Sequence, residues 1–135
     1  MRTKRVAVAA RPGLLATVME CVGDGVAVED LTSGTKLRHQ LHRMQPLLVV
    51  VDERAGRTWR AISAVPRIHL VRSQPRVIAL LEKIDQRRER LAAMAGCYDA
   101  VDLSRSSWPD DLREAVWLAG QDDAADLPVV TTGQG

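Results

Sequence analysis

Asp52 and Glu53 are two carboxylates that directly follow a run of five apolar residues, Leu47 to Val51. A run that is apolar on both faces is typical of a buried central strand in a parallel sheet. Ligands and chemistry gather at the carboxyl ends of such strands. The sequence therefore places Asp52 where a doubly wound α/β fold keeps its active site, and its role there depends on its neighbours.

Arg11 is the expected neighbour of Asp52, because it follows another short apolar run and the two residues should end adjacent parallel strands. Opposite unit charges about 4 Å apart attract by roughly 4 kcal/mol in a partly screened site, before the cost of desolvation. We therefore expect Arg11 to hold Asp52 as a permanent ion pair. Glu29 and Asp30, at the end of the second predicted strand, are rival partners for Arg11.

Other reactive residue types lack a supporting pattern. His39 and His42 have a spacing that suits a metal, but without a third ligand a solvated helix face is the better interpretation. Cys21 and Cys97 are isolated and are interpreted as free thiols in a reducing compartment. We find no phosphate-binding glycine loop and no nucleophile elbow. We therefore predict no enzyme activity, no metal and no cofactor.

Composition is that of an ordinary globular domain, with 46% apolar and 27% charged residues in a chain of 135. The net charge of +2 gives no argument for nucleic acid. The apolar run near the N-terminus is too short for a signal peptide, and no stretch approaches a membrane span. We therefore expect a cytoplasmic protein that contacts neither nucleic acid nor a membrane directly.

Apolar runs and helical spacing alternate along the chain in five strand–helix units. Strands are predicted at about residues 6–10, 26–28, 47–52, 67–72 and 98–103, and helices at about 12–22, 34–44, 59–65, 76–95 and 108–119. This alternation implies a parallel sheet covered on both faces. Five units fit a flavodoxin-like doubly wound sandwich of three layers with strand order 2-1-3-4-5. Residues 1–121 form this domain, and residues 122–135 are interpreted as a flexible tail or linker.

Four segments at matching order and spacing carry a resemblance to a known family. They are Arg5 to Ala9, Gln45 to Asp52, Ala95 to Val101 and Ser107 to Leu112. Together they resemble the first strand, the segment with the acceptor aspartate, the turn before the fifth strand and the start of the last helix of response-regulator receiver domains, which are CheY-like. The resemblance covers roughly residues 5–120.

The resemblance implies that Asp52 is the phosphoacceptor position, but the residues expected around it differ from the family. Family members bind Mg²⁺ through the acceptor aspartate and a pair of acids after the first strand, since hard cations need oxygen ligands. Ala10 and Arg11 stand at the positions of those acids, and Leu103 stands at the position of the family's lysine. Phosphoryl transfer depends on positioning and charge neutralisation, so we expect little of it here.

Two further positions of the family's switch are assigned by the same resemblance. Ser73 is the hydroxyl expected after the predicted fourth strand, where the family has Thr or Ser. Ala100 stands at the position of the family's aromatic residue in the fifth strand. Tyr98, two residues earlier on the same predicted face, could substitute for it.

The predicted fourth helix, residues 76–95, is seven or eight residues longer than a receiver usually has and would overhang the sheet by about 10 Å. Receivers often dimerise or bind partners through the fourth helix, fifth strand and last helix. Arg87, Arg88 and Arg90 on the long helix and Trp117 on the last helix are therefore candidate interface residues. We expect protein partners, with a homodimer through this face.

Three functions remain open at this point. The leading one is an atypical receiver, or pseudo-receiver, which acts by protein–protein contact and could be the regulatory domain of a transcriptional regulator. The second is a working phosphoacceptor of a two-component system that uses Asp52, with metal ligation by Glu29, Asp30 or Glu53. The third is a small-molecule-binding flavodoxin-like domain.

Overall fold

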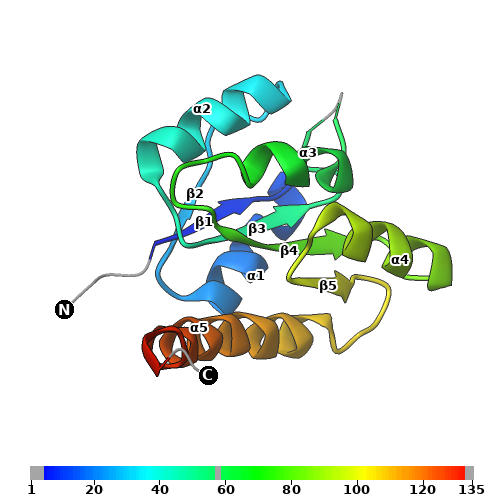
Figure 1. Cartoon of the computed structure of the whole chain (residues 1–135). Helices are drawn as coiled ribbons and strands as arrows, with labels where there is room; N and C mark the ends of the chain where they lie inside the picture. Colours follow the sequence, from blue (N-terminus) through cyan, green and yellow to red (C-terminus); the bar gives the residue numbers. More distant parts are fainter. Residues whose placement is uncertain (1–4, 57–58, 133–135) are drawn as a thin grey trace.

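The computed structural model describes residues 5–56 and 59–132, with side chains as far as Gln121 (Figure 1). Five parallel strands form one sheet in the order β2-β1-β3-β4-β5. The strands are β1 (Val6–Ala9), β2 (Gly25–Ala27), β3 (Leu48–Asp52), β4 (Arg76–Leu81) and β5 (Asp99–Asp102). The helices are α1 (Pro12–Val22), α2 (Gly34–Met44), α3 (Ala61–Ile68), α4 (Gln86–Ala95) and α5 (Trp108–Thr132). The predicted fold class and strand order are confirmed.

Helices cover both faces of the sheet, with α1 and α5 on one side and α2, α3 and α4 on the other (Figure 1). Successive strand residues point to opposite faces. Ala9, Val49 and Val51 therefore enter the cluster beneath α2 and α3, whereas Val8 and Val50 enter the cluster beneath α1 and α5. This two-sided burial explains why β3 is an unbroken apolar run.

The fourth strand and the fourth helix lie elsewhere than predicted. Residues 67–72 finish α3 and turn, and the helix contains Pro66 instead of ending before it. The strand is β4, whose residues Val77 to Leu81 are all buried. An entirely apolar run satisfies helical spacing as well as strand spacing, so periodicity alone could not separate the two.

The prediction of an elongated fourth helix is therefore wrong. Helix α4 begins after Asp85, whose side chain accepts a hydrogen bond from the Arg88 backbone N–H at 2.8 Å. It ends at Gly96, which adopts a left-handed φ of 96° that glycine tolerates best. Its ten residues fit the sheet, and the predicted overhang is absent.

The last helix continues beyond the predicted domain end. The described backbone of α5 is helical to Thr132, whereas the sequence analysis ends the domain at residue 121. A linker role for residues 122–135 stays a prediction. Within the described chain, no helix combines the length and the apolar character that crossing a membrane requires.

The position of β4 can be tested with two leucine substitutions. Leu80 is fully buried in β4, and Leu70 is 72% exposed in the turn after α3. We expect Leu80→Ala to lower the free energy of unfolding by about 2 to 5 kcal/mol and Leu70→Ala to change it by less than about 0.5 kcal/mol. Urea denaturation measures both, and the reverse order would restore the strand at residues 67–72.

Candidate functional site

The ends of β1 and β3 bring Asp52 and Arg11 together. Ala9 pairs with Val51 in the sheet, so the next residues of both strands emerge side by side at the carboxyl edge. Asp52 is the last residue of β3 and is completely buried, and Arg11 is the N-cap residue of α1 with an extended backbone. The local chain path therefore brings the Asp52 carboxylate and the Arg11 guanidinium together at the carboxyl edge of the sheet.

Arg11 binds Asp52 through three hydrogen bonds. Its Nε and Nη2 donate to the two carboxylate oxygens at 2.7 and 2.6 Å, and its backbone N–H donates at 2.9 Å. The backbone N–H of Arg54 adds a fourth bond at 3.2 Å. The ion pair expected from the sequence is thus present, in the bidentate geometry that makes arginine–carboxylate pairs strong.

Glu82 and Arg54 extend this pair into a four-residue cluster, which we call the Arg11 cluster: Arg11, Asp52, Arg54 and Glu82. Nη1 of Arg11 lies 2.6 Å from Oε1 of Glu82, and Nε of Arg54 lies 3.5 Å from the same oxygen. Glu82 follows β4 directly, so the misplacement of that strand hid its role from the sequence analysis. The only sequence signal for this role was the position of Glu82 directly after an apolar run.

The rival partners expected for Arg11 do not pair with it. Asp30 accepts hydrogen bonds from the Thr32 hydroxyl at 2.7 Å and from Lys36 at 3.0 Å. The Thr32 hydroxyl and the Lys36 ammonium lower the pKa of Asp30 to about 2. Glu29 is exposed at the end of β2. Arg11 therefore pairs with Asp52 and not with Glu29 or Asp30.

The Arg11 cluster keeps Asp52 ionised. Burial alone raises the pKa of the Asp52 carboxyl, but the hydrogen bonds from Arg11 and Arg54 more than offset this, and the net pKa lies below its usual value. The hydrogen bond with Asp52 in turn raises the pKa of the Arg11 guanidinium. Both groups stay charged at neutral pH.

The residues present do not fit the Mg²⁺ site of a phosphoacceptor. Both oxygens of Asp52 already accept bonds from Arg11, whose guanidinium occupies the place of a cation and would repel one. Ala10 offers only a methyl group. Among the described residues, no three His, Cys, Asp or Glu side chains gather in a way that could hold a metal ion.

Glu53 forms a second ion pair, with Arg88 of α4. The carboxylate is buried and takes bonds from Nη1 and Nη2 of Arg88 at 2.6 and 2.5 Å, as well as from the Glu82 backbone N–H at 3.0 Å. Burial raises the pKa of Glu53, but Arg88 and the backbone more than offset this, and the net pKa is lowered. Arg88 therefore ties α4 to β3, which makes it a poor interface residue.

Leu103 follows β5, and its apolar side chain supplies no positive charge for Asp52. It is half-buried and packs with the cluster beneath α1 and α5, and its backbone N–H donates to Leu81 at 2.8 Å. Asp102, the last residue of β5, closes the loop by accepting bonds from the Ser104 hydroxyl at 2.6 Å and from the Ile84 backbone at 3.2 Å. The residues at the end of β5 thus stabilise the loop and the sheet.

The structure places neither Ser73 nor Tyr98 beside Asp52. Ser73 lies before β4, where its hydroxyl donates to the Pro46 carbonyl at 2.5 Å, so its expected position after the fourth strand is wrong. Tyr98 lies before β5, with its ring 5.5 Å from the Arg76 guanidinium carbon. Its ring packs with the cluster beneath α1 and α5, whereas Ala100 packs with the one beneath α4.

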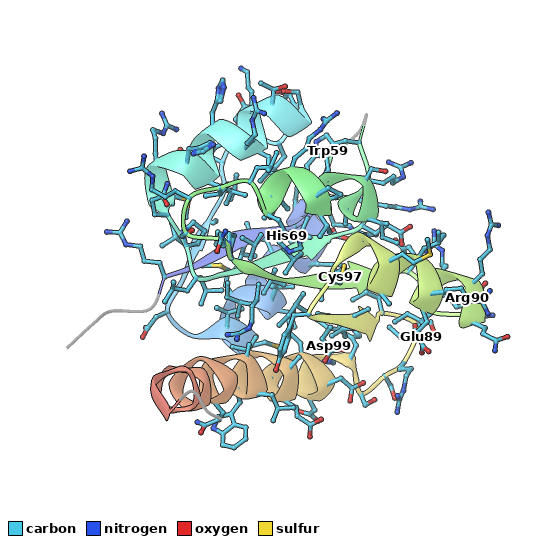
Figure 2. All side chains as sticks on the ribbon, in the orientation of Figure 1. Trp59, His69, Glu89, Arg90, Cys97 and Asp99 are labelled. Carbon is cyan, nitrogen blue, oxygen red and sulfur yellow. The ribbon has the colours of Figure 1, made fainter. Side chains whose placement is uncertain are left out.

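The remaining interface candidates are on the surface. Arg87 and Arg90 are exposed on α4 (Figure 2 labels Arg90), and Trp117 is 62% exposed on α5. Cys21 and Cys97 are free thiols, and burial raises the pKa of Cys97 to about 11. Cys97 is therefore a poor nucleophile at neutral pH.

An apolar hollow of about 610 Å³ lies next to the Arg11 cluster, at the ends of β1 and β2. Its walls are mostly apolar, and Glu29 and Thr32 bring the polar side chains. The residues that line the hollow are Ala10, Pro12, Leu15, Ala27, Val28, Glu29, Leu31, Thr32 and Ala55. Ligand sites usually add several convergent polar groups to such walls. The hollow alone therefore gives little support to the small-molecule alternative.

Solved structures with the same fold include receiver domains of response regulators. The response regulator domain of Thermotoga maritima CheB is 15% identical, with a TM-score of 0.70 over 89% of this chain and 96% of that one. The BeF₃-activated DrrB receiver domain is 21% identical, with a TM-score of 0.70 over 90% and 99%. A LuxR-family two-component response regulator from Aurantimonas sp. SI85-9A1 is 17% identical, with a TM-score of 0.70 over 87% and 84%.

This chain has the receiver-domain fold. No family model and no curated protein sequence matches it. The likeness thus rests on the three-dimensional arrangement, which covers nearly the whole described chain. In the receiver fold, Asp52 ends the central strand β3, and the Arg11 cluster fills the space around its carboxylate.

The ion pair makes a prediction for stability and its pH dependence. Arg11→Met leaves a buried carboxylate without its cation, so we expect a loss of about 3 kcal/mol in the free energy of unfolding at pH 7. Burial then raises the pKa of Asp52 above that of the unfolded chain, so the variant regains stability as the pH falls from about 7 to about 5. Chemical denaturation at several pH values measures this.

The parent protein should behave in the opposite way. Its Asp52 has a lowered pKa when folded, so the stability that the pair supplies is complete above about pH 4 and is lost only below that. The double variant Arg11→Met/Asp52→Asn removes the titrating group and should lose the pH dependence between 5 and 7. A flat profile in Arg11→Met itself would contradict a buried, unpaired Asp52.

Proposed function

We propose that this protein is an atypical, receiver-like signalling module that is not switched by Mg²⁺-dependent phosphorylation. The observation that carries the proposal is the three-bond contact between Arg11 and Asp52. The guanidinium supplies in a fixed form the positive charge that a bound metal supplies in the family. The carboxylate then has no free oxygen with which to attack a phosphoryl donor.

The two ion pairs also support a fixed conformation. The Arg11 cluster joins the ends of β1, β3 and β4, and the Glu53–Arg88 pair joins β3 to the first turn of α4. Each pair has one completely or nearly buried carboxylate. Breaking either pair would leave an uncompensated charge, so the loops at this edge are expected to remain in one arrangement.

Absence of phosphoacceptor chemistry can be tested with beryllofluoride, a phosphoryl mimic, in the presence of Mg²⁺. Trp59 is a suitable reporter, since its indole N–H donates to the Leu31 carbonyl at 3.0 Å in the loops near Asp52. We expect no saturable change in tryptophan fluorescence, because the Asp52 oxygens are occupied. A saturable change that Asp52→Asn abolishes would instead establish a working phosphoacceptor, the second function left open by the sequence.

The variant Ala10→Asp/Arg11→Asp provides the positive control. It removes the guanidinium and places two carboxylates beside Asp52, which gives a hard cation the oxygen ligands it needs. We expect this variant to respond to millimolar Mg²⁺ in the same assay. Circular dichroism of this variant checks that it folds.

Output by protein–protein contact is the second part of the proposal. Large apolar side chains are exposed on α4 and α5, which flank β5 in Figure 1. They are Leu91 at 41%, Met94 at 77%, Trp117 at 62% and Leu118 at 40% exposure. Exposed tryptophan and methionine are favoured at interfaces. We propose a homodimer through this face, in the role of a regulatory domain such as those of transcriptional regulators.

Self-association should depend on these side chains. We expect Met94→Ser/Trp117→Ser to shift the sedimentation coefficient toward the monomer, because it removes the two most exposed apolar groups of this face. Val26→Ser is the matched control, since Val26 is 49% exposed on β2 at the far edge of the sheet. A parent protein that sediments as a monomer at all concentrations would rule out the homodimer.

A further inference from the structure

Charge is distributed very unevenly along the chain. Residues 31–81 contain nine arginine and lysine residues, and Asp52 and Glu53 are the only acids among them. Residues 82–126 contain eleven acids and six arginine and lysine residues. The net charge of +2 averages these two parts and therefore says little about either one.

The fold turns the basic segment into one face. Helices α2 and α3 contact each other on the same side of the sheet (Figure 1), and neither contains an acid. Asp52 and Glu53 are buried at the carboxyl edge of the sheet and are neutralised by Arg11 and Arg88. The solvent side of α2 and α3 thus presents positive charge, and Figure 2 shows nitrogen-tipped side chains along it. The acids Glu29 and Asp30 border this surface only at its β2 edge, beside His39 and Arg43.

We define the basic face as Arg38, His39, His42, Arg43, Arg60, Arg67 and Arg72, which lie on α2, on α3 and beside the ends of α3. The two helices approach closely, since a Cβ built on Gly34 of α2 would lie 3.6 Å from Nη1 of Arg67. Ser73 donates to the Pro46 carbonyl and holds the turn with Arg72 against the connection that follows α2 and Arg43. The face is therefore continuous across both helices.

Four arginines of this face have no intramolecular role. Within residues 5–56 and 59–121, Arg38, Arg43, Arg67 and Arg72 make no side-chain hydrogen bond or ion pair. Lys36, by contrast, is paired with Asp30 at 3.0 Å. Unpaired arginines that gather on one surface raise its positive potential and attract anionic partners.

The face also lacks the features of a protein–protein interface. Such interfaces have an apolar or aromatic centre, and the exposed positions of α2 and α3 are polar or charged apart from Pro66. The large exposed apolar residues lie elsewhere, with only Leu70 near the end of α3. Interfaces with nucleic acid are instead polar and strongly positive.

We propose that the α2–α3 face binds the phosphate backbone of double-stranded nucleic acid. The guanidinium groups contact phosphates, and contacts of this kind carry no sequence information, so binding is independent of sequence. Trp59 is half-buried, with its indole N–H bonded to the Leu31 carbonyl, and among the described residues of this face no Trp, Tyr or Phe is exposed for stacking on single strands. This function is separate from the apolar face of α4 and α5.

Fluorescence anisotropy of the full chain with a short labelled DNA duplex of mixed sequence tests the proposal. We expect binding at about 50 mM salt that weakens steeply toward about 200 mM. Replacement of Arg38, Arg43, Arg67 and Arg72 by Gln should raise the Kd at least about tenfold and reduce the slope of log K against log salt by about 3 to 4, since each lost phosphate contact removes about 0.9.

The matched control replaces Lys83, Arg87, Arg90 and Arg105 by Gln, which lowers the net charge by the same amount on the α4 side. It should leave the Kd within about twofold. Absence of binding by the parent protein, or an equal loss in both variants, would overturn the proposal. Tighter binding to a polyglutamate chain than to the duplex would also overturn it and would identify an acidic protein as the partner.

Discussion

The contact between Arg11 and Asp52 is the constraint on which the functional edge of this protein depends. A carboxylate with no exposed surface at the end of a central strand must be neutralised, protonated or bound to a cation. Here the neighbouring strand supplies the cation as a side chain. Because that side chain also belongs to the first residue before α1, the same contact fixes where the helix begins. Glu82 and Arg54 then take their positions from the guanidinium.

The two sides of the molecule differ in surface chemistry. The α4 and α5 side exposes apolar groups and belongs to the segment, residues 82–126, that holds eleven of the chain's 17 acids, whereas the α2 and α3 side is polar and basic. The topology makes this division possible, because α2 and α3, which are neighbours on one face of the sheet, come from consecutive units of the chain. A local excess of arginine in the sequence thereby becomes a continuous patch in space.

The sequence predicted the Arg11–Asp52 pair correctly but misplaced the fourth strand and the fourth helix. The Arg11–Asp52 pair follows from two strand ends that parallel topology places side by side, and both ends were marked by a charge after an apolar run. The fourth strand was missed because Val77 to Leu81 are apolar at every position, which hides the period of two. Glu82 and Arg88 were lost with it, since their roles depend on where that strand ends. No local signal shows that Tyr98 would pack on one side of the sheet and Ala100 on the other.

One physical difference between the Arg11 guanidinium and a bound metal ion is that the guanidinium is covalently attached to the chain. A free ion leaves its site upon dilution or chelation, whereas a side chain that begins the adjacent helix remains at a high effective concentration beside its carboxylate. Under the proposed function, the module would not be reset by removing an ion or a phosphoryl group. Its output would follow the amount of protein that the cell makes, and control over it would lie in synthesis and degradation.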